Sequence, residues 1–105
     1  MPKVFVPNLS AHDHSDAERY GELVFVTKGL LPKHATSNMH RFWMEALRDS
    51  QPTDYILLTG PTTLCVIGAA VFGAMHGRLN LLIWRTDRYF SREILFNKLM
   101  EGVKE

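Results

Sequence analysis

The chain has one cysteine, almost no net charge and no long unbroken apolar run, and each shortage removes a class of protein. Cys65 has no second cysteine to pair with, so we expect a buried thiol in a reducing, cytoplasmic compartment. Twelve basic against eleven acidic residues leave a formal charge of +1, which argues against a dedicated nucleic-acid binder. The opening "MPKVFVPN" lacks the pattern of a signal peptide.

The most apolar stretch is long enough on paper to cross a bilayer. Twenty-three uncharged residues run from Tyr55 to Gly77, whereas a membrane helix needs roughly 20. However, Gly60 and Pro61 would break a helix near the middle and leave backbone groups unpaired in lipid. We therefore expect no membrane span, but a strand, a turn, a helix and another strand.

Hydrophobic periodicity predicts the remaining elements. Strands are expected at 3–8, 22–29, 55–59, 79–84 and 88–95. Helices are expected at 34–50 and 62–76, and a single turn at 15–19 in which Ser15 and Glu18 form a capping box. Gly77 fits the end of the 62–76 helix, and Thr62 its N-cap. The helix at 34–50 would be capped by Ser37 or Asn38.

These elements predict an α/β fold. We expect a single small Rossmann-like domain over residues 1–105, with a mostly parallel sheet of four to five strands and a central βαβ unit. Residues 97–105 would be a terminal helix or a flexible tail. The helix at 62–76 is apolar nearly all round, so we expect a homo-oligomer, with Ala69 or Gly73 near an interface or under a tightly packed tail.

The segment "TGPTT" is the first candidate site, because it joins a strand to the start of a helix. Free backbone N–H groups and the helix dipole favour an anion there. Its candidate ligand-binding residues are Thr59, Gly60, Thr62 and Thr63. The segment lacks the lysine of a P-loop and the glycine spacing of a dinucleotide site. The simpler alternative is that Thr62 only caps the helix and Gly60 only makes the turn.

Two further polar segments follow the first two strands. His12, Asp13 and His14 are candidate acid or base groups, but their spacing matches no zinc signature, so we expect no metal and no cofactor. A polar turn is the competing interpretation. After the second strand, Lys28, Asn38 and Arg41 are candidate phosphate or base ligands within a segment that also holds Lys33 and His34.

Four stretches, "HDHSDAERYG", "VFVTKG", "DYILLTGPTTL" and "HGRLNLLIWR", resemble a group of small proteins of tailed phages and bacteria, over residues 3–96. This resemblance implies a viral origin and carries no catalytic residue. In architecture, a short Rossmann-like domain with Thr-Gly after a central strand is similar to the sensors and ring nucleases that handle cyclic oligonucleotides.

Three functions therefore stay open. The first is a small protein that binds a nucleotide or other phosphorylated small molecule. The second is an oligomeric protein-interaction or structural protein without such a ligand. The third is a phosphoesterase or cyclic-nucleotide-degrading enzyme that uses the histidine loop, so whether the chain is an enzyme is undecided.

Overall fold

A computed structural model describes residues 1–10, 12–29 and 35–101. Lys33, His34 and the last residues of the expected tail lie outside this description. Five strands form one sheet: β1 (Lys3–Leu9), β2 (Glu22–Lys28), β3 (Tyr55–Leu57), β4 (Arg78–Arg85) and β5 (Arg88–Leu95). The helices are α1 (Thr36–Ala46) and α2 (Thr62–His76), with short 3-10 helices η1 (Ser15–Arg19) and η2 (Phe96–Lys98).

The sheet is mixed, with the order β2-β1-β3-β4-β5. The pairs β1–β2, β1–β3 and β3–β4 are parallel, whereas β4–β5 is an antiparallel hairpin whose register opposes Trp84 to Tyr89. A turn of two residues, Thr86 and Asp87, joins these last strands. Two strands joined by so short a turn can pair only in opposite directions.

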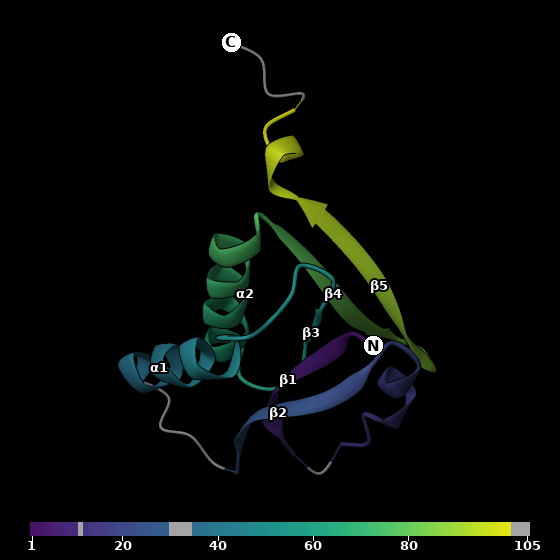
Figure 1. Cartoon of the computed structure of the whole chain (residues 1–105). Coiled ribbons are helices and arrows are strands. Elements are labelled where there is room, and N and C mark those ends of the chain that lie inside the picture. The colour runs from purple at the N-terminus through teal and green to yellow at the C-terminus, as the bar shows by residue number, and fades with distance from the viewer. Residues whose placement is uncertain (11, 30–34, 102–105) are drawn as a thin grey trace.

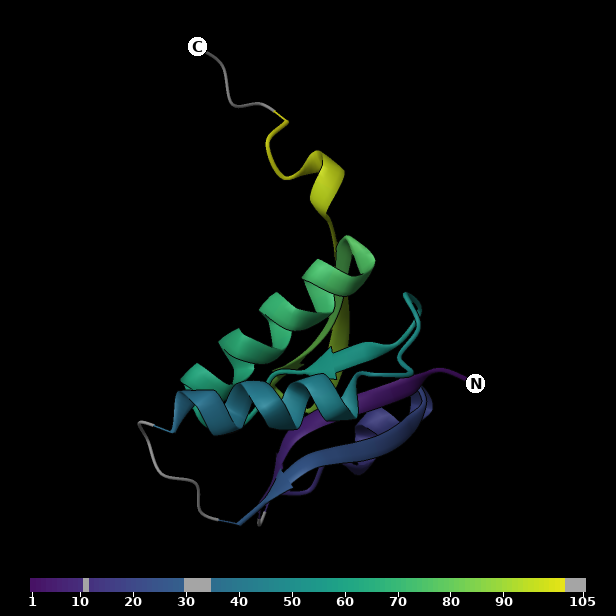
Figure 2. The ribbon, with the colours of Figure 1, turned by 60° about the vertical axis from the view of Figure 1, so that its left-hand side comes forward.

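The two faces of the sheet are covered unequally. Both α1 and α2 lie on one side of the sheet, while η1 lies on the other (Figure 1, Figure 2). Phe5 and Ile56 pack beneath the α-helices, and Val4, Val6 and Leu57 point to the η1 side. This alternation follows from the period of two along a strand.

The expected Rossmann-like domain is therefore wrong, and the sheet is mixed. A doubly wound sheet needs helices on both faces, whereas here both α-helices share one face. The cause is the connection between β1 and β2 (residues 10–21), in which the described residues form the 3-10 helix η1 and no α-helix. The antiparallel β5 is the second departure from that fold.

Glycines let side chains approach α2 closely. A Cβ on Gly68 would lie 2.3 Å from the Trp43 ring, and one on Gly73 would lie 2.2 Å from the Phe96 ring. Trp43 is buried and donates from Nε1 to the carbonyl of Leu64 at 2.8 Å. The Phe96 ring, just before the expected tail, therefore lies over Gly73. No helix in the described ranges is long and apolar enough to cross a membrane.

Candidate functional site

Three segments meet at the carboxyl edge of the parallel strands. They are the histidine loop (residues 12–14) after β1, the β3–α2 turn (residues 58–61), and the turn end of the β4–β5 hairpin. A cavity of about 340 Å³ lies among them, which we call the histidine cavity. It is lined by His12, Asp13, His14, Leu58, Thr59, Trp84 and Tyr89. Ligands of α/β sheets commonly bind at this edge.

His14 is a buried polar group of the cavity, with 5% of its surface exposed. Its Nδ1 lies 2.9 Å from the hydroxyl of Tyr89, and its Nε2 is buried without a hydrogen-bond partner among the described residues. Burial lowers the pKa of His14, and the neighbouring His12 lowers it further. The lowered pKa favours the neutral ring, and none of the described residues makes a hydrogen bond to its Nε2.

Tyr89 is held in its protonated form. Burial raises the pKa of its hydroxyl, and the carboxylates of Asp16 and Asp13 raise it further. The same ring packs edge-on against Trp84, with 5.0 Å between centroids. Tyr89 therefore offers a hydroxyl for hydrogen bonding, and it does not offer a phenolate as a nucleophile.

Asp13 is oriented by the start of η1. Its Oδ1 accepts a hydrogen bond of 2.8 Å from the backbone N–H of Ser15. This bond is the main cause of a lowered pKa at Asp13, and the Ser15 side chain adds to it. The predicted capping box is wrong, because the Ser15 side chain makes no cap and the Asp13 carboxylate meets the first N–H instead.

His12 is the exposed member of the histidine loop. Its backbone N–H donates to the hydroxyl of Ser10 at 3.3 Å, and its ring centroid lies 6.4 Å from that of His14. Both imidazoles line one cavity, but His14 is buried and His12 is open to solvent.

The β3–α2 turn lines a second cavity, of about 450 Å³, which we call the α2 groove. Its residues are Leu58, Thr59, Gly60, Thr62, Cys65, Val66, Ala69 and Leu81. Gly60 has φ of +85°, a left-handed conformation that favours glycine. The Cys65 thiol donates to the carbonyl of Thr59 at 3.1 Å, and burial raises its pKa, so it remains a thiol.

The first turn of α2 carries no side-chain cap. Pro61 occupies the N-cap position, so the prediction that Thr62 is the N-cap is wrong. Thr62 and Thr63 are the first two helical residues, and both are exposed. The N-cap of α1 is Ala35, and neither Ser37 nor Asn38 has that role.

Lys28, Asn38 and Arg41 lie apart from these two cavities. Lys28 is the exposed last residue of β2, and neither lining includes it. On the exposed side of α1, Arg41 donates to the Asn38 side chain at 2.8 Å. The structure thus brings together the histidine loop and the β3–α2 turn, but it does not add the third segment to their cavities.

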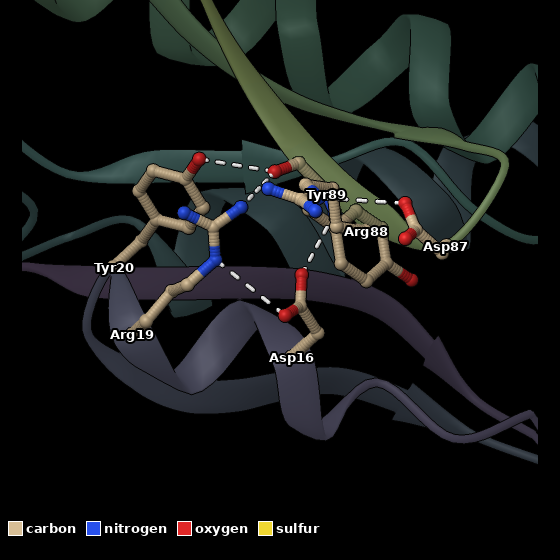
Figure 3. A network of polar contacts seen from close by, with 6 residues as sticks. All are labelled: Asp16, Arg19, Tyr20, Asp87, Arg88 and Tyr89. Carbon is tan, nitrogen blue, oxygen red and sulfur yellow. Dashed lines mark hydrogen bonds and ion pairs between the residues drawn. The ribbon is translucent and has the colours of Figure 1, made fainter.

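A polar network fixes β5 against η1 (Figure 3). Asp16 accepts from the backbone N–H of Tyr89 at 2.8 Å, and the carbonyl of Tyr89 accepts from Arg19 and from the hydroxyl of Tyr20. Arg19 also pairs with Asp16 at 3.5 Å. Tyr89 lies 73 residues after Asp16 in the sequence, and these contacts hold it beside η1 and the histidine cavity.

Sequence reasoning missed Tyr89 and Trp84 as residues of the site. The signal was the short turn at Thr86 and Asp87, which sets Tyr89 opposite Trp84 at the end of a strand parallel to β3. Both aromatic side chains therefore lie at the same edge as the histidine loop.

The cavity groups are suited to hydrogen bonding and to proton exchange with a bound molecule. They comprise a neutral His14, a protonated Tyr89, an exposed His12 and an ionised Asp13. Over residues 1–10, 12–29 and 35–101, no group of three or more His, Cys, Asp or Glu side chains could hold a metal ion.

The fold and the site define a small α/β protein with a mixed sheet and a polar cavity at its carboxyl edge. The chain belongs to the phage Pam3 gp32-like protein family, which it matches over residues 2–98. The resemblance to phage proteins is thereby confirmed. The likeness to cyclic-oligonucleotide proteins depended on a Rossmann-like architecture and is lost with it. No curated protein and no solved structure matches the chain.

Proposed function

We propose that this phage-family protein binds a nucleotide or other phosphorylated small molecule at the turn between β3 and α2. One observation carries the proposal: Thr59 lies in the wall of both the histidine cavity and the α2 groove. A ligand at this turn could therefore contact the histidine loop on one side and the first turn of α2 on the other.

The phosphate would bind at the start of α2. The first N–H groups of a helix lack intrahelical partners, and the helix dipole favours negative charge there. Gly60 leaves this approach free of a side chain, and even an added Cβ would meet only the Asn8 side chain, at 3.6 Å. His12, on the exposed side of the cavity, is a further donor for an anion.

The planar part of such a ligand would lie against Trp84. This indole is 49% exposed although it lines the histidine cavity, so one surface of a large aromatic side chain remains free for stacking. The two cavities, of about 340 and 450 Å³, fall in the range of small-molecule sites.

Calorimetric titration with mononucleotides, dinucleotides and cyclic nucleotides tests the proposal. Replacing Gly60 by valine should abolish binding, because the side chain would cover the turn. Gly77→Val is the matched control, since Gly77 also has a positive φ, of +69°, but lies at the far end of α2. If no nucleotide binds, or if both variants bind like the wild type, the phosphate site is wrong.

Substitution of Lys28 and Arg41 tests whether the ligand stays within the two cavities or extends over β2 and α1. If the ligand is confined to the two cavities, Lys28→Ala and Arg41→Ala should leave the affinity unchanged while His12→Ala lowers it. A ligand that extends over β2 and α1 would instead lose affinity in both basic variants, more strongly at low salt.

A second candidate function is self-association through α2. Val66 is 61% exposed and Met75 is 43% exposed, and both lie on a helix with a high apolar content. Ala70 and Ala74 are exposed on the same helix. Apolar surface of this kind favours contact with another protein surface, here a second copy of the chain.

A further inference from the structure

A third cavity, of about 580 Å³, lies between η1 and β2 on the side of the sheet opposite the α-helices. We call it the η1–β2 groove. It is lined by Met1, Leu9, His12, Asp13, His14, Ser15, Glu18, Gly21, Glu22, Leu23 and Phe25. The histidine loop lines both this groove and the histidine cavity, whereas the β3–α2 turn of the proposed nucleotide site does not line the groove.

The floor of the groove is apolar. Leu23 and Phe25 are half-buried and pack against the core cluster on the η1 side of the sheet. They remain half-open because η1, with five residues, is too short to cover both β1 and β2. Leu9 extends the same apolar surface and is exposed. Apolar side chains left half-covered at an edge are suited to contact with a partner.

The rim of the groove is acidic. Asp13, Glu18 and Glu22 contribute carboxylates, and none of the described residues in the wall is a lysine or an arginine. Glu18 and Glu22 are exposed, and the ion pairs found in the described part of the chain involve other acids. Among the described residues of the wall, the three carboxylates outnumber the one ammonium group, that of Met1, so the rim carries an excess of negative charge.

The strand beside the groove is an open edge. β2 is the last strand in the sheet order and pairs only with β1, so its outer row of N–H and C=O groups has no strand partner within the described residues. Such an edge can accept a further strand, because main-chain hydrogen bonds provide affinity and side-chain pockets provide specificity.

We propose that the η1–β2 groove binds an extended segment of a partner protein in which basic residues flank apolar residues spaced two apart, so that the apolar side chains share one face. The apolar side chains would cover Leu23 and Phe25, and the basic ones would pair with Glu18 and Glu22. His14 also lines the groove, and its buried Nε2 is without a partner in the described ranges. The acidic rim repels a phosphate backbone, so charge complementarity favours a basic protein segment over a nucleic acid.

A short fluorescent peptide with two leucines spaced two residues apart and lysines flanking them provides the probe, and fluorescence anisotropy is the measurement. The full chain should bind this peptide, and binding should weaken as salt screens the rim charges. Glu18→Gln combined with Glu22→Gln should reduce the affinity about tenfold, because two exposed ion pairs are lost. Glutamate in place of lysine in the peptide should abolish binding.

The control variant combines Glu45→Gln with Asp49→Asn, which makes the same change in net charge at exposed positions on and after α1. It should bind the lysine peptide like the wild type. The proposal is overturned if the lysine peptide does not bind, if the two double variants bind equally, or if the glutamate peptide binds as tightly. Because the assay contains no nucleotide and leaves Gly60 intact, its failure does not affect the proposed phosphate site.

Discussion

The hydroxyl of Tyr89 lies 2.9 Å from Nδ1 of His14, although 75 residues separate the two in sequence. The backbone of Tyr89 is held at the same time by Asp16, Arg19 and Tyr20, all from η1 or the residue after it. The contact between His14 and Tyr89 therefore joins the histidine loop to β5, and the shape of the histidine cavity depends on this contact.

Replacing Tyr89 by phenylalanine should lower the free energy of unfolding by about 1–2 kcal/mol, because the buried imidazole of His14 loses its partner. Urea denaturation measures the change. Tyr55→Phe is the control, since the Tyr55 hydroxyl makes no hydrogen bond within the described chain, and its loss should cost less. Equal effects of the two substitutions would show that the His14 contact contributes little.

The pH dependence of stability should carry a contribution from His14. Its pKa in the folded protein lies below the ordinary value of 6.5, so the unfolded chain takes up a proton first as the pH falls. The stability from neutral His14 is therefore present above about pH 6.5 and is lost as the pH falls toward the folded-state pKa. Urea midpoints measured across this range should show a slope that His14→Gln reduces. The exposed His40→Gln variant should retain it, and a slope unchanged in His14→Gln would contradict the assignment.

The effect of Gly73→Ala on stability should change sign when the Phe96 ring is removed. In the wild-type chain, Gly73→Ala should destabilise by about 1–3 kcal/mol, because its Cβ would lie 2.2 Å from the Phe96 ring. In a Phe96→Ala background the same change should stabilise by up to about 1 kcal/mol, since alanine favours the helix. A double-mutant cycle by chemical denaturation measures both signs. An equal effect in the two backgrounds would contradict the packing of Phe96 on α2.

Thr86 is strained in the hairpin turn, and glycine should relieve the strain. Its φ is +57°, a conformation unfavourable for a β-branched residue, and it is the one non-glycine residue with positive φ among those described. Thr86→Gly should therefore raise the free energy of unfolding by about 1 kcal/mol. Thr53→Gly, at an exposed turn position, should give no such gain. Thermal melting compares the two, and a loss of stability in Thr86→Gly would contradict the argument.

Self-association through α2 should be sensitive to a charge on its exposed side. Light scattering at micromolar concentration should show at least a dimer, and Val66→Lys should convert it to a monomer because the charge would be buried at the contact. Met44→Lys, on the exposed side of α1, is the control and should leave the association state unchanged. A monomeric wild-type chain would remove this candidate function.

The elements could be predicted from the sequence because their signals are local. The alternation in β1, the glycine after α2 and the Gly60–Pro61 break each depend on neighbouring residues, and the structure has a strand or helix at each expected segment. The helix caps were predicted less well, because neighbouring polar residues give nearly the same signal. At the start of η1, the Asp13 side chain takes the role assigned to the Ser15 side chain, two positions further on.

The arrangement of the elements could not be predicted so well, because it depends on contacts between distant residues. Both α-helices lie on one face because the segment between β1 and β2 forms the short helix η1 and leaves the other face without an α-helix in the described chain. The periodicity of a helix does not indicate which face of the sheet the helix covers. The convergence of His14 with Thr59 followed from the rule that parallel strands end at one edge. The part played by Tyr89 required the register of the β4–β5 hairpin.

The hydrogen bonds between the backbone of Tyr89 and the side chains of Asp16, Arg19 and Tyr20 also make the loop after β1 dependent on β5. β1 can pair with β2 as soon as residues up to Lys28 are available, but the loop between them gains its contact with Tyr89 only after β5 has formed. Until then, His14 has no partner for its Nδ1, and the histidine loop is free to sample other conformations. The loop that carries both histidines of the candidate site therefore depends on β5, so we expect a chain shortened before Arg88 to lose the contacts that fix this loop.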